Sequence, residues 1–110
     1  MHEHLVVTIQ KADDNPALCI ANPFRARPGS IVRFIMVGED SAEIEFMGDG
    51  TNPTLFDTPF DSRTFKLNKA GPGHAQIDKK VRDDAPVRGF GFHITWPTGE
   101  GNGSGEVIGR

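Results

Sequence analysis

The chain has 110 residues, a mass of 12.0 kDa and a formal charge of −3. This length fits one domain over residues 1–110, with a single core that needs no disulfide or metal to hold it. The scattered Lys and Arg argue against nucleic acid as the main partner, and no apolar run reaches the roughly 18 residues of a membrane span.

The first residues, Met1 to His4, lack the basic region and apolar core of a signal peptide. As given, the chain is expected to be cytoplasmic, or periplasmic or extracellular if a leader has been removed. Cys19 is the only cysteine, so no internal disulfide can form. Its neighbours Leu18 and Ile20 predict a small buried hydrophobe at this position.

Thirteen Gly, eight Pro and frequent Val, Ile and Phe favour many short strands over helices. In chain order, strands are expected over residues 5–9, 17–21, 31–37, 42–46, 63–67, 74–78, 90–96 and 106–108. Residues 48–61 are expected to form a long loop that tucks Leu55, Phe56 and Phe60 under the edge of the fold. A helical turn is plausible only over 79–86, and 98–105 read as a flexible glycine-rich loop.

The clearest pattern lies in residues 88–97, where Phe90, Phe92, Ile94 and Trp96 recur at every second position. An extended strand sends these side chains to one face, so this segment predicts a core strand. About eight strands at regular intervals suit a two-sheet sandwich or a small barrel. The expected fold class is all-β, a two-sheet antiparallel Greek-key β-sandwich of about seven or eight strands.

Three segments together resemble a cupredoxin of the plastocyanin or azurin type. They are FRARPGSIVRF at 24–34, DSAEIEF at 40–46, and GFGFHITWP at 89–97 followed by GSGEVI at 103–108. In the family, these correspond to the central strand and its preceding turn, the region of the first copper-binding histidine, and the strands around the ligand loop. The resemblance covers most of the chain from Phe24 onward and implies a cupredoxin-like fold.

The sequence departs from the family at the metal. A blue-copper site uses two His and one Cys, with a weak axial Met. Here the first His position falls at Ala42 and Glu43, the Cys position falls near Ile94, and residues 95–105 contain neither His nor Met. The resemblance therefore implies a domain without the type 1 copper ligands, and electron transfer is not implied. No cofactor is expected.

Histidines are the remaining candidates for a metal site, because imidazole binds divalent ions near neutral pH. His2 and His4 bracket Glu3 at the chain end, where a weak site and a solvated terminus are alternatives. His93 lies on the strand face opposite Phe92 and Ile94. It is either a metal ligand with nearby carboxylates or a hydrogen-bonded sheet histidine.

No motif indicates an enzyme. The glycine repeat at 99–105 is followed by a strand pattern and not by the helix that a phosphate loop requires. The aspartates lack EF-hand spacing, and the serines lack a nucleophile elbow. The chain is therefore expected to be non-catalytic.

Aromatic residues near predicted loops suggest a binding surface. The candidates for an exposed platform that contacts a sugar or a partner protein are Trp96, Phe24, Phe56 and Phe60. For Trp96 the alternative is a core position, because the alternation points it inward with Phe92.

The preferred hypothesis is a non-catalytic binding or structural module that meets its partner through loops at 51–60 and 95–102. The alternatives are a copper or zinc protein with non-family ligands including His93, and a carbohydrate-binding β-sandwich. The expected state is a monomer or a weak homodimer, with another protein or a small ligand as partner.

Overall fold

The computed structural model describes residues 3–15, 17–47, 58–69 and 73–109. These residues form nine β-strands and no helix, so the all-β expectation is confirmed. For the same residues, no helix long and apolar enough to cross a membrane is found. The strands are β1 (His4–Lys11), β2 (Cys19–Ala21), β3 (Phe24–Ala26), β4 (Ile31–Met36), β5 (Ser41–Phe46), β6 (Thr64–Lys69), β7 (Ala75–Lys80), β8 (Gly89–Trp96) and β9 (Gly99–Val107).

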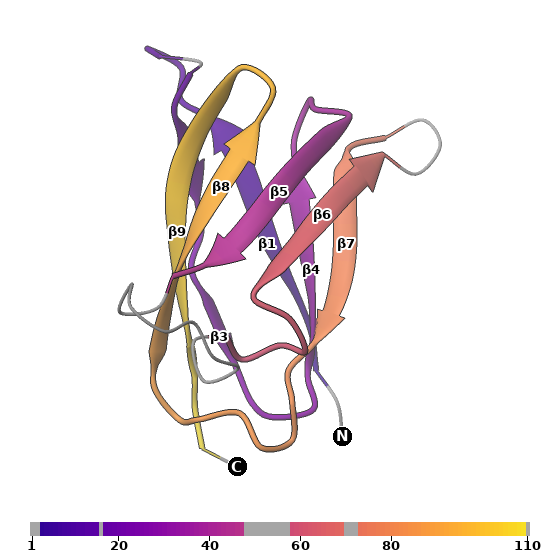
Figure 1. The fold of residues 1–110 in the computed structure, drawn as a ribbon, viewed down its shortest axis with the longest axis vertical. Helices are drawn as coiled ribbons and strands as arrows, with labels where there is room; N and C mark the ends of the chain where they lie inside the picture. The colour runs from indigo at the N-terminus through magenta and orange to yellow at the C-terminus, as the bar shows by residue number, and fades with distance from the viewer. Residues whose placement is uncertain (1–2, 16, 48–57, 70–72, 110) are drawn as a thin grey trace.

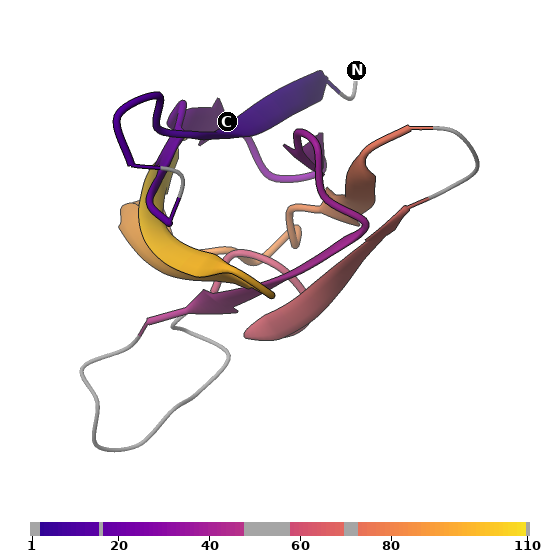
Figure 2. The ribbon, with the colours of Figure 1, turned by 90° about the horizontal axis from the view of Figure 1, so that it is seen from above.

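Hydrogen bonds join all nine strands into one mixed sheet, in the order β2-β1-β4-β7-β6-β5-β8-β9-β3. The pairs β1–β4 and β3–β9 are parallel, and the other pairs are antiparallel. The sheet curls, with β1 and β4 on one side and β5 and β6 on the other (Figures 1 and 2). The buried apolar side chains of these strands form one core cluster. This arrangement differs from the expected pair of separate antiparallel sheets.

The two halves of the curled sheet are connected by a short pairing between β6 and β7. Only the end of β6 takes part, through the partner pairs Asn68↔Gln76 and Lys69↔Ala75. Below this point the two strands diverge (Figure 1). This connection makes one hydrogen-bonded sheet out of what the strand pattern predicts as two.

The segment of residues 58–62 lies near the diverging ends of β6 and β7 and supplies Phe60 to the core, as the sequence predicted. Thr58 shapes its backbone, because its hydroxyl accepts a hydrogen bond from the Phe60 N–H at 3.1 Å and donates one to the Ser62 carbonyl at 3.1 Å. The Arg82 N–H donates to the Pro59 carbonyl at 2.9 Å. Leu55 and Phe56, which were predicted to tuck under the same edge, lie outside the described residues.

A side-chain amide supports the edge of β1 at the point where β2 leaves it. The Oδ1 of Asn22 accepts a hydrogen bond from the Thr8 N–H at 2.6 Å, and its Nδ2 donates to the Val6 carbonyl at 3.3 Å. Pro23, which comes next, has no N–H to offer to a strand partner. Asn22 therefore satisfies the backbone of β1 while the chain crosses over to pair with β9 as β3.

The core is built from phenylalanine rings contributed by strands far apart in the sequence. Phe34, Phe46, Phe60 and Phe92 are fully buried. Their ring centroids lie 5.2 Å apart for Phe46 and Phe92, and 5.7 Å apart for Phe34 and Phe92. Aromatic pairs at such separations add to the stabilisation that comes from burying apolar area.

The prediction of a flexible loop over 98–105 is wrong, because these residues begin the nine-residue strand β9. Its glycines alternate with polar residues and face the interior. A Cβ at Gly103 would overlap the ring of Phe92, one at Gly105 would overlap the ring of Phe24, and one at Gly101 would overlap the Cys19 sulfur. Glycine is required at these positions because large side chains from other strands already fill the space.

The polar segment at 79–86 contains no helical turn. Strand β7 extends through Lys79 and Lys80, and the chain then makes a hydrogen-bonded turn in which the Ala85 N–H donates to the Arg82 carbonyl at 3.1 Å. Lys79 stays in the strand because its ammonium bonds to the Asp61 carboxylate and lies 5.2 Å from the centre of the Phe65 ring. Tertiary contacts thus extend β7 beyond the expected end at residue 78.

Replacing Gly103 by alanine tests this packing. The added methyl collides with the buried Phe92 ring, so we expect the free energy of unfolding to fall by about 1–3 kcal/mol. In the control Gly91→Ala, the nearest atom to the new Cβ is Met47 Cε at 3.4 Å, an ordinary contact. The measurement is the free energy of unfolding of both variants in urea. Equal values for Gly103→Ala and Gly91→Ala would contradict the packing role of Gly103.

The Asp61–Lys79 ion pair predicts a pH-dependent contribution to stability. The hydrogen bond from the Lys79 ammonium lowers the pKa of Asp61. Stabilisation is therefore complete above the unfolded-state pKa of about 3.9 and is lost as the pH falls through the lower native value. Because Asp61 is largely exposed, we expect Asp61→Asn to cost less than about 1 kcal/mol at pH 7.

The difference between wild type and Asp61→Asn should shrink as the pH falls through the native pKa of Asp61, because the carboxyl then becomes protonated in both states. Asp13→Asn is the control, because Asp13 forms no ion pair with the described residues. Chemical denaturation as a function of pH gives the measurement. A difference that persists unchanged in acid would mean that the ion pair is not its source.

Candidate functional site

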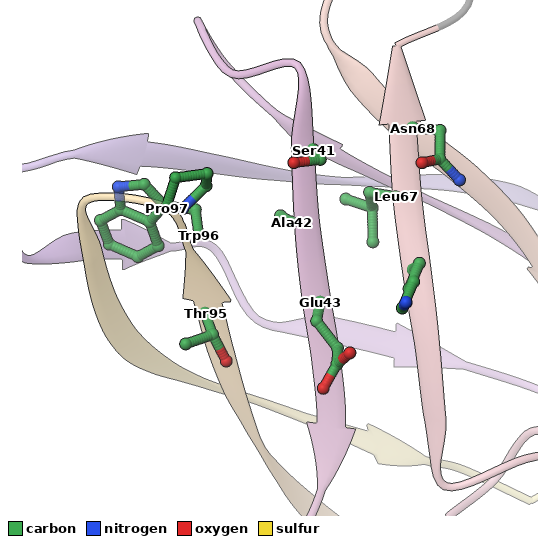
Figure 3. Close-up of a pocket in the computed structure, with 9 residues that line it drawn as sticks. Ser41, Ala42, Glu43, Leu67, Asn68, Thr95, Trp96 and Pro97 are labelled. Atoms are coloured by element: carbon green, nitrogen blue, oxygen red, sulfur yellow. The ribbon is translucent and has the colours of Figure 1, made fainter.

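A groove of about 450 Å³ lies on the outer face of the sheet over β5, β6 and β8 (Figure 3). It forms because strand alternation sends small and polar side chains outward here, while Ala42, Ile44 and Leu67 point into the core. Its lining residues are Ser41, Ala42, Glu43, Lys66, Leu67, Asn68, Thr95, Trp96 and Pro97.

The strand register brings the polar side chains of the groove together in rows. Glu43 on β5 lies directly between Lys66 on β6 and Thr95 on β8. In the next row, Ser41 lies opposite Asn68. The groove thus offers a carboxylate, an ammonium, an amide and two hydroxyl groups within one short stretch of three strands.

Glu43 and Lys66 differ from most charged residues of the protein. Eight ion pairs connect Lys or Arg with Asp or Glu among the described residues, including Arg33 with Asp78 and Arg25 with Glu106. Glu43 is half-buried and directly opposite Lys66, yet neither of them makes an ion pair or hydrogen bond with a side chain of the described residues. Both groups therefore remain available to an external partner.

Pro97 lies on the left side of the groove in the view of Figure 3, next to Trp96. The Trp96 side chain is only 5% exposed, and its Nε1 is buried without a hydrogen-bond partner among the described residues. Trp96 therefore contributes to the core, as its alternation indicated. Phe60 is fully buried and Phe24 is only 4% exposed, so none of these three rings offers an exposed stacking face. Phe56 lies outside the described residues.

His93 lies beside the groove, on the same outer face of β8. Its Nδ1 is 3.0 Å from Asn102 Oδ1, and its Nε2 is 3.7 Å from Glu100 Oε2. Glu45 is its register partner on β5 and lies 3.9 Å from an Arg63 nitrogen. These contacts correspond to the hydrogen-bonded sheet histidine of the sequence analysis.

A metal ligand set is not assembled in the part of the chain that the structure describes, where no group of three or more His, Cys, Asp and Glu is placed to hold an ion. His4 is exposed at the start of β1, and His2 lies outside the described residues. Cys19 is half-buried, and burial raises the pKa of its thiol. A raised pKa disfavours the thiolate that metals and electrophiles need.

The positions at which the resemblance would place copper ligands carry hydrocarbon. Ala42 is 6% exposed and Ile94 is fully buried, and both belong to the core cluster. Glu43, the alternative first-ligand position, points outward into the groove.

The sequence alone did not identify this groove. In the sequence, its polar residues are ordinary solvent-exposed strand residues, namely Ser41, Glu43, Lys66 and Asn68. The alternation in 42–46 predicted only that one face of the strand is exposed to solvent. The missing information is the register that places Glu43 opposite Lys66. Thr95 was included in one of the two expected binding segments, and it does line the groove.

No family model matches the chain, and no curated protein matches it. Among solved structures, it is similar to Lac15 from a marine microbial metagenome, with 16% sequence identity and a TM-score of 0.45. The match covers all of this chain and 33% of Lac15, so the chain spans about a third of that protein's length.

Proposed function

We propose that this chain is a non-catalytic, cupredoxin-like binding module that holds a small, hydroxyl-rich ligand of the carbohydrate class in the groove over β5, β6 and β8. The observation that carries the proposal is the unpaired state of Glu43 and Lys66, which face each other in the groove while most other charged side chains of the described residues have partners.

The chemistry of the groove favours a neutral ligand with several hydroxyl groups. Glu43 and Lys66 carry opposite charges, so a charged ligand would meet a group of its own sign. A sugar hydroxyl both donates and accepts hydrogen bonds, and it can therefore bond to the carboxylate, the ammonium or the Asn68 amide. The exposed ring of Pro97 adds an apolar surface for the C–H face of a sugar.

Binding without catalysis is supported by the surroundings of the two hydroxyl groups. An activated Ser or Thr nucleophile needs a hydrogen bond to a general base. The hydroxyls of Ser41 and Thr95 make no such bond among the described residues, and neither His nor Cys lines the groove.

The cupredoxin-like part of the proposal rests on the three segments that carry the resemblance. Residues 24–34 include β3 and the first part of β4, and residues 40–46 include β5. Residues 89–97 include β8, and residues 103–108 include the last part of β9. The curled sheet has two halves that meet at the short β6–β7 pairing. If each half is taken as one layer, the arrangement is compatible with a Greek-key sandwich. Hydrocarbon at Ala42 and Ile94 supports a version without copper.

The test is a titration of isotopically labelled protein with a panel of neutral mono- and oligosaccharides, followed by two-dimensional NMR. We expect amide shifts centred on Ser41, Glu43, Lys66 and Thr95. Trp96 is the only tryptophan of the chain and lies behind the groove, so its fluorescence gives a second readout.

Glu43→Ala and Lys66→Ala should each weaken binding by about tenfold or more, because each removes a hydrogen bond to a charged group. Lys80→Ala is the matched control for Lys66→Ala, since Lys80 is an exposed strand lysine outside the groove. Absence of shifts across the panel, or shifts centred elsewhere, would refute the proposal.

A further inference from the structure

The outer surface of the curled sheet differs in composition between the half that contains β1 and β4 and the half that contains β5 and β6. On the side of the molecule opposite the groove, strands β1, β2 and β4 send apolar side chains outward. These are Val6, Ile20, Ile31 and Ile35, together with Val37 just after β4. Val6 is 51% exposed and Ile20 is 68% exposed. On the groove side, the outward-facing residues of β5 and β6 are polar, namely Ser41, Glu43, Glu45, Thr64, Lys66 and Asn68. We call the first surface the β1–β4 face.

The register makes the apolar residues of the β1–β4 face neighbours. On β1, Val6 and Thr8 lie beside Arg33 and Ile35 of the parallel strand β4. Ile20 on β2 lies beside Gln10, one row further along β1. β-Branched side chains thus extend across three adjacent strands, broken mainly by uncharged polar groups.

The charges near the centre of the β1–β4 face are paired with each other. Arg33 Nε donates to Asp78 Oδ1 at 2.7 Å, and Arg33 Nη2 donates to Asp78 Oδ2 at 3.1 Å. These bonds lower the pKa of Asp78, which stays ionised and paired at neutral pH. A partner that covers the centre of the face therefore meets these two charges already joined. Lys80, the register partner of Ile31, is the exposed charge at the border of the face.

The shape of the face suits a second sheet. One hollow is lined by Thr8, Gln10, Ile20 and Asn22, and another by His4, Leu5, Val6, Ile31, Arg33 and Asp78. Ile20 projects strongly beside the first hollow. Twisted sheets pack face to face about 10 Å apart when side chains of one layer fill such hollows in the other.

We propose that the β1–β4 face is a homodimer interface, covered by the same face of a second copy of this chain. A partner that covers this face should be largely apolar and have no net charge there. It should also offer an acceptor for the Arg33 guanidinium and a donor for the Asp78 carboxylate. The face itself has this chemistry. In a two-fold dimer the same patch of both copies meets, so the free N–H groups of one Arg33 can reach the Asp78 of the other. This proposal is independent of the ligand groove, which lies on the opposite side.

Sedimentation velocity on the full chain, from about 10 μM to about 1 mM, tests the proposal. We expect a reversible increase from monomer to dimer with concentration. Ile35→Lys places an unpaired charge in the interface and should weaken the dimer at least tenfold. Thr64→Lys makes the same kind of change on the outer face of β6 and should leave it unaltered.

A second variant, Val6→Lys, covers the case in which Ile35→Lys fails to fold, because Val6 is already half exposed. Circular dichroism confirms that each variant used is folded. Wild-type protein that stays monomeric at the highest concentration overturns the proposal. So does a dimer that resists both folded lysine variants or is lost on Thr64→Lys.

Discussion

The contact between aromatic rings and the glycines of β9 is the constraint on which the fold depends. Phe92 and Phe24 occupy the space that side chains at Gly103 and Gly105 would otherwise need. Without these Cβ atoms, β9 can pair with β8 on one side and with β3 on the other while it covers the rings. The curled sheet therefore encloses a core of large rings with a strand that contributes almost no side-chain volume of its own.

Enclosing the core in this way determines both outer faces of the sheet. Each strand that buries one set of residues must expose the alternate set. In β5 the exposed set is polar and includes Glu43, whereas in β4 it includes Ile35 beside the paired Arg33 and Asp78. One strand pattern thus yields a polar groove over β5 and an apolar face over β4. The strands β4 and β5 lie on opposite sides of the curled sheet (Figure 2).

The ion pairs distinguish structural from available charge. Pairs such as Lys79 with Asp61 hold neighbouring segments together and are used within the fold. Glu43 and Lys66 form no ion pair with the described residues. Glu43 is half-buried and Lys66 is exposed. Leaving a directly opposed pair unjoined costs little stability, since exposed pairs contribute weakly. It does provide polar groups for a ligand, which is the basis of the proposed binding function.

Local alternation was sufficient to predict one core strand, because it involves only neighbouring positions, Phe90, Phe92, Ile94 and Trp96. From this pattern the sequence alone determined the core strand, the all-β class and the inward position of Trp96. Phe60 in the core followed from its apolar character within a polar loop. The strand β9 could not be found in this way, because glycine repeats are typical of loops and the atoms that require these glycines belong to other segments of the chain, such as the rings of Phe92 and Phe24. Only the tertiary structure decided the groove and the single mixed sheet. Both depend on which residues lie opposite one another across neighbouring strands, and this register arises from long-range packing and not from any local pattern.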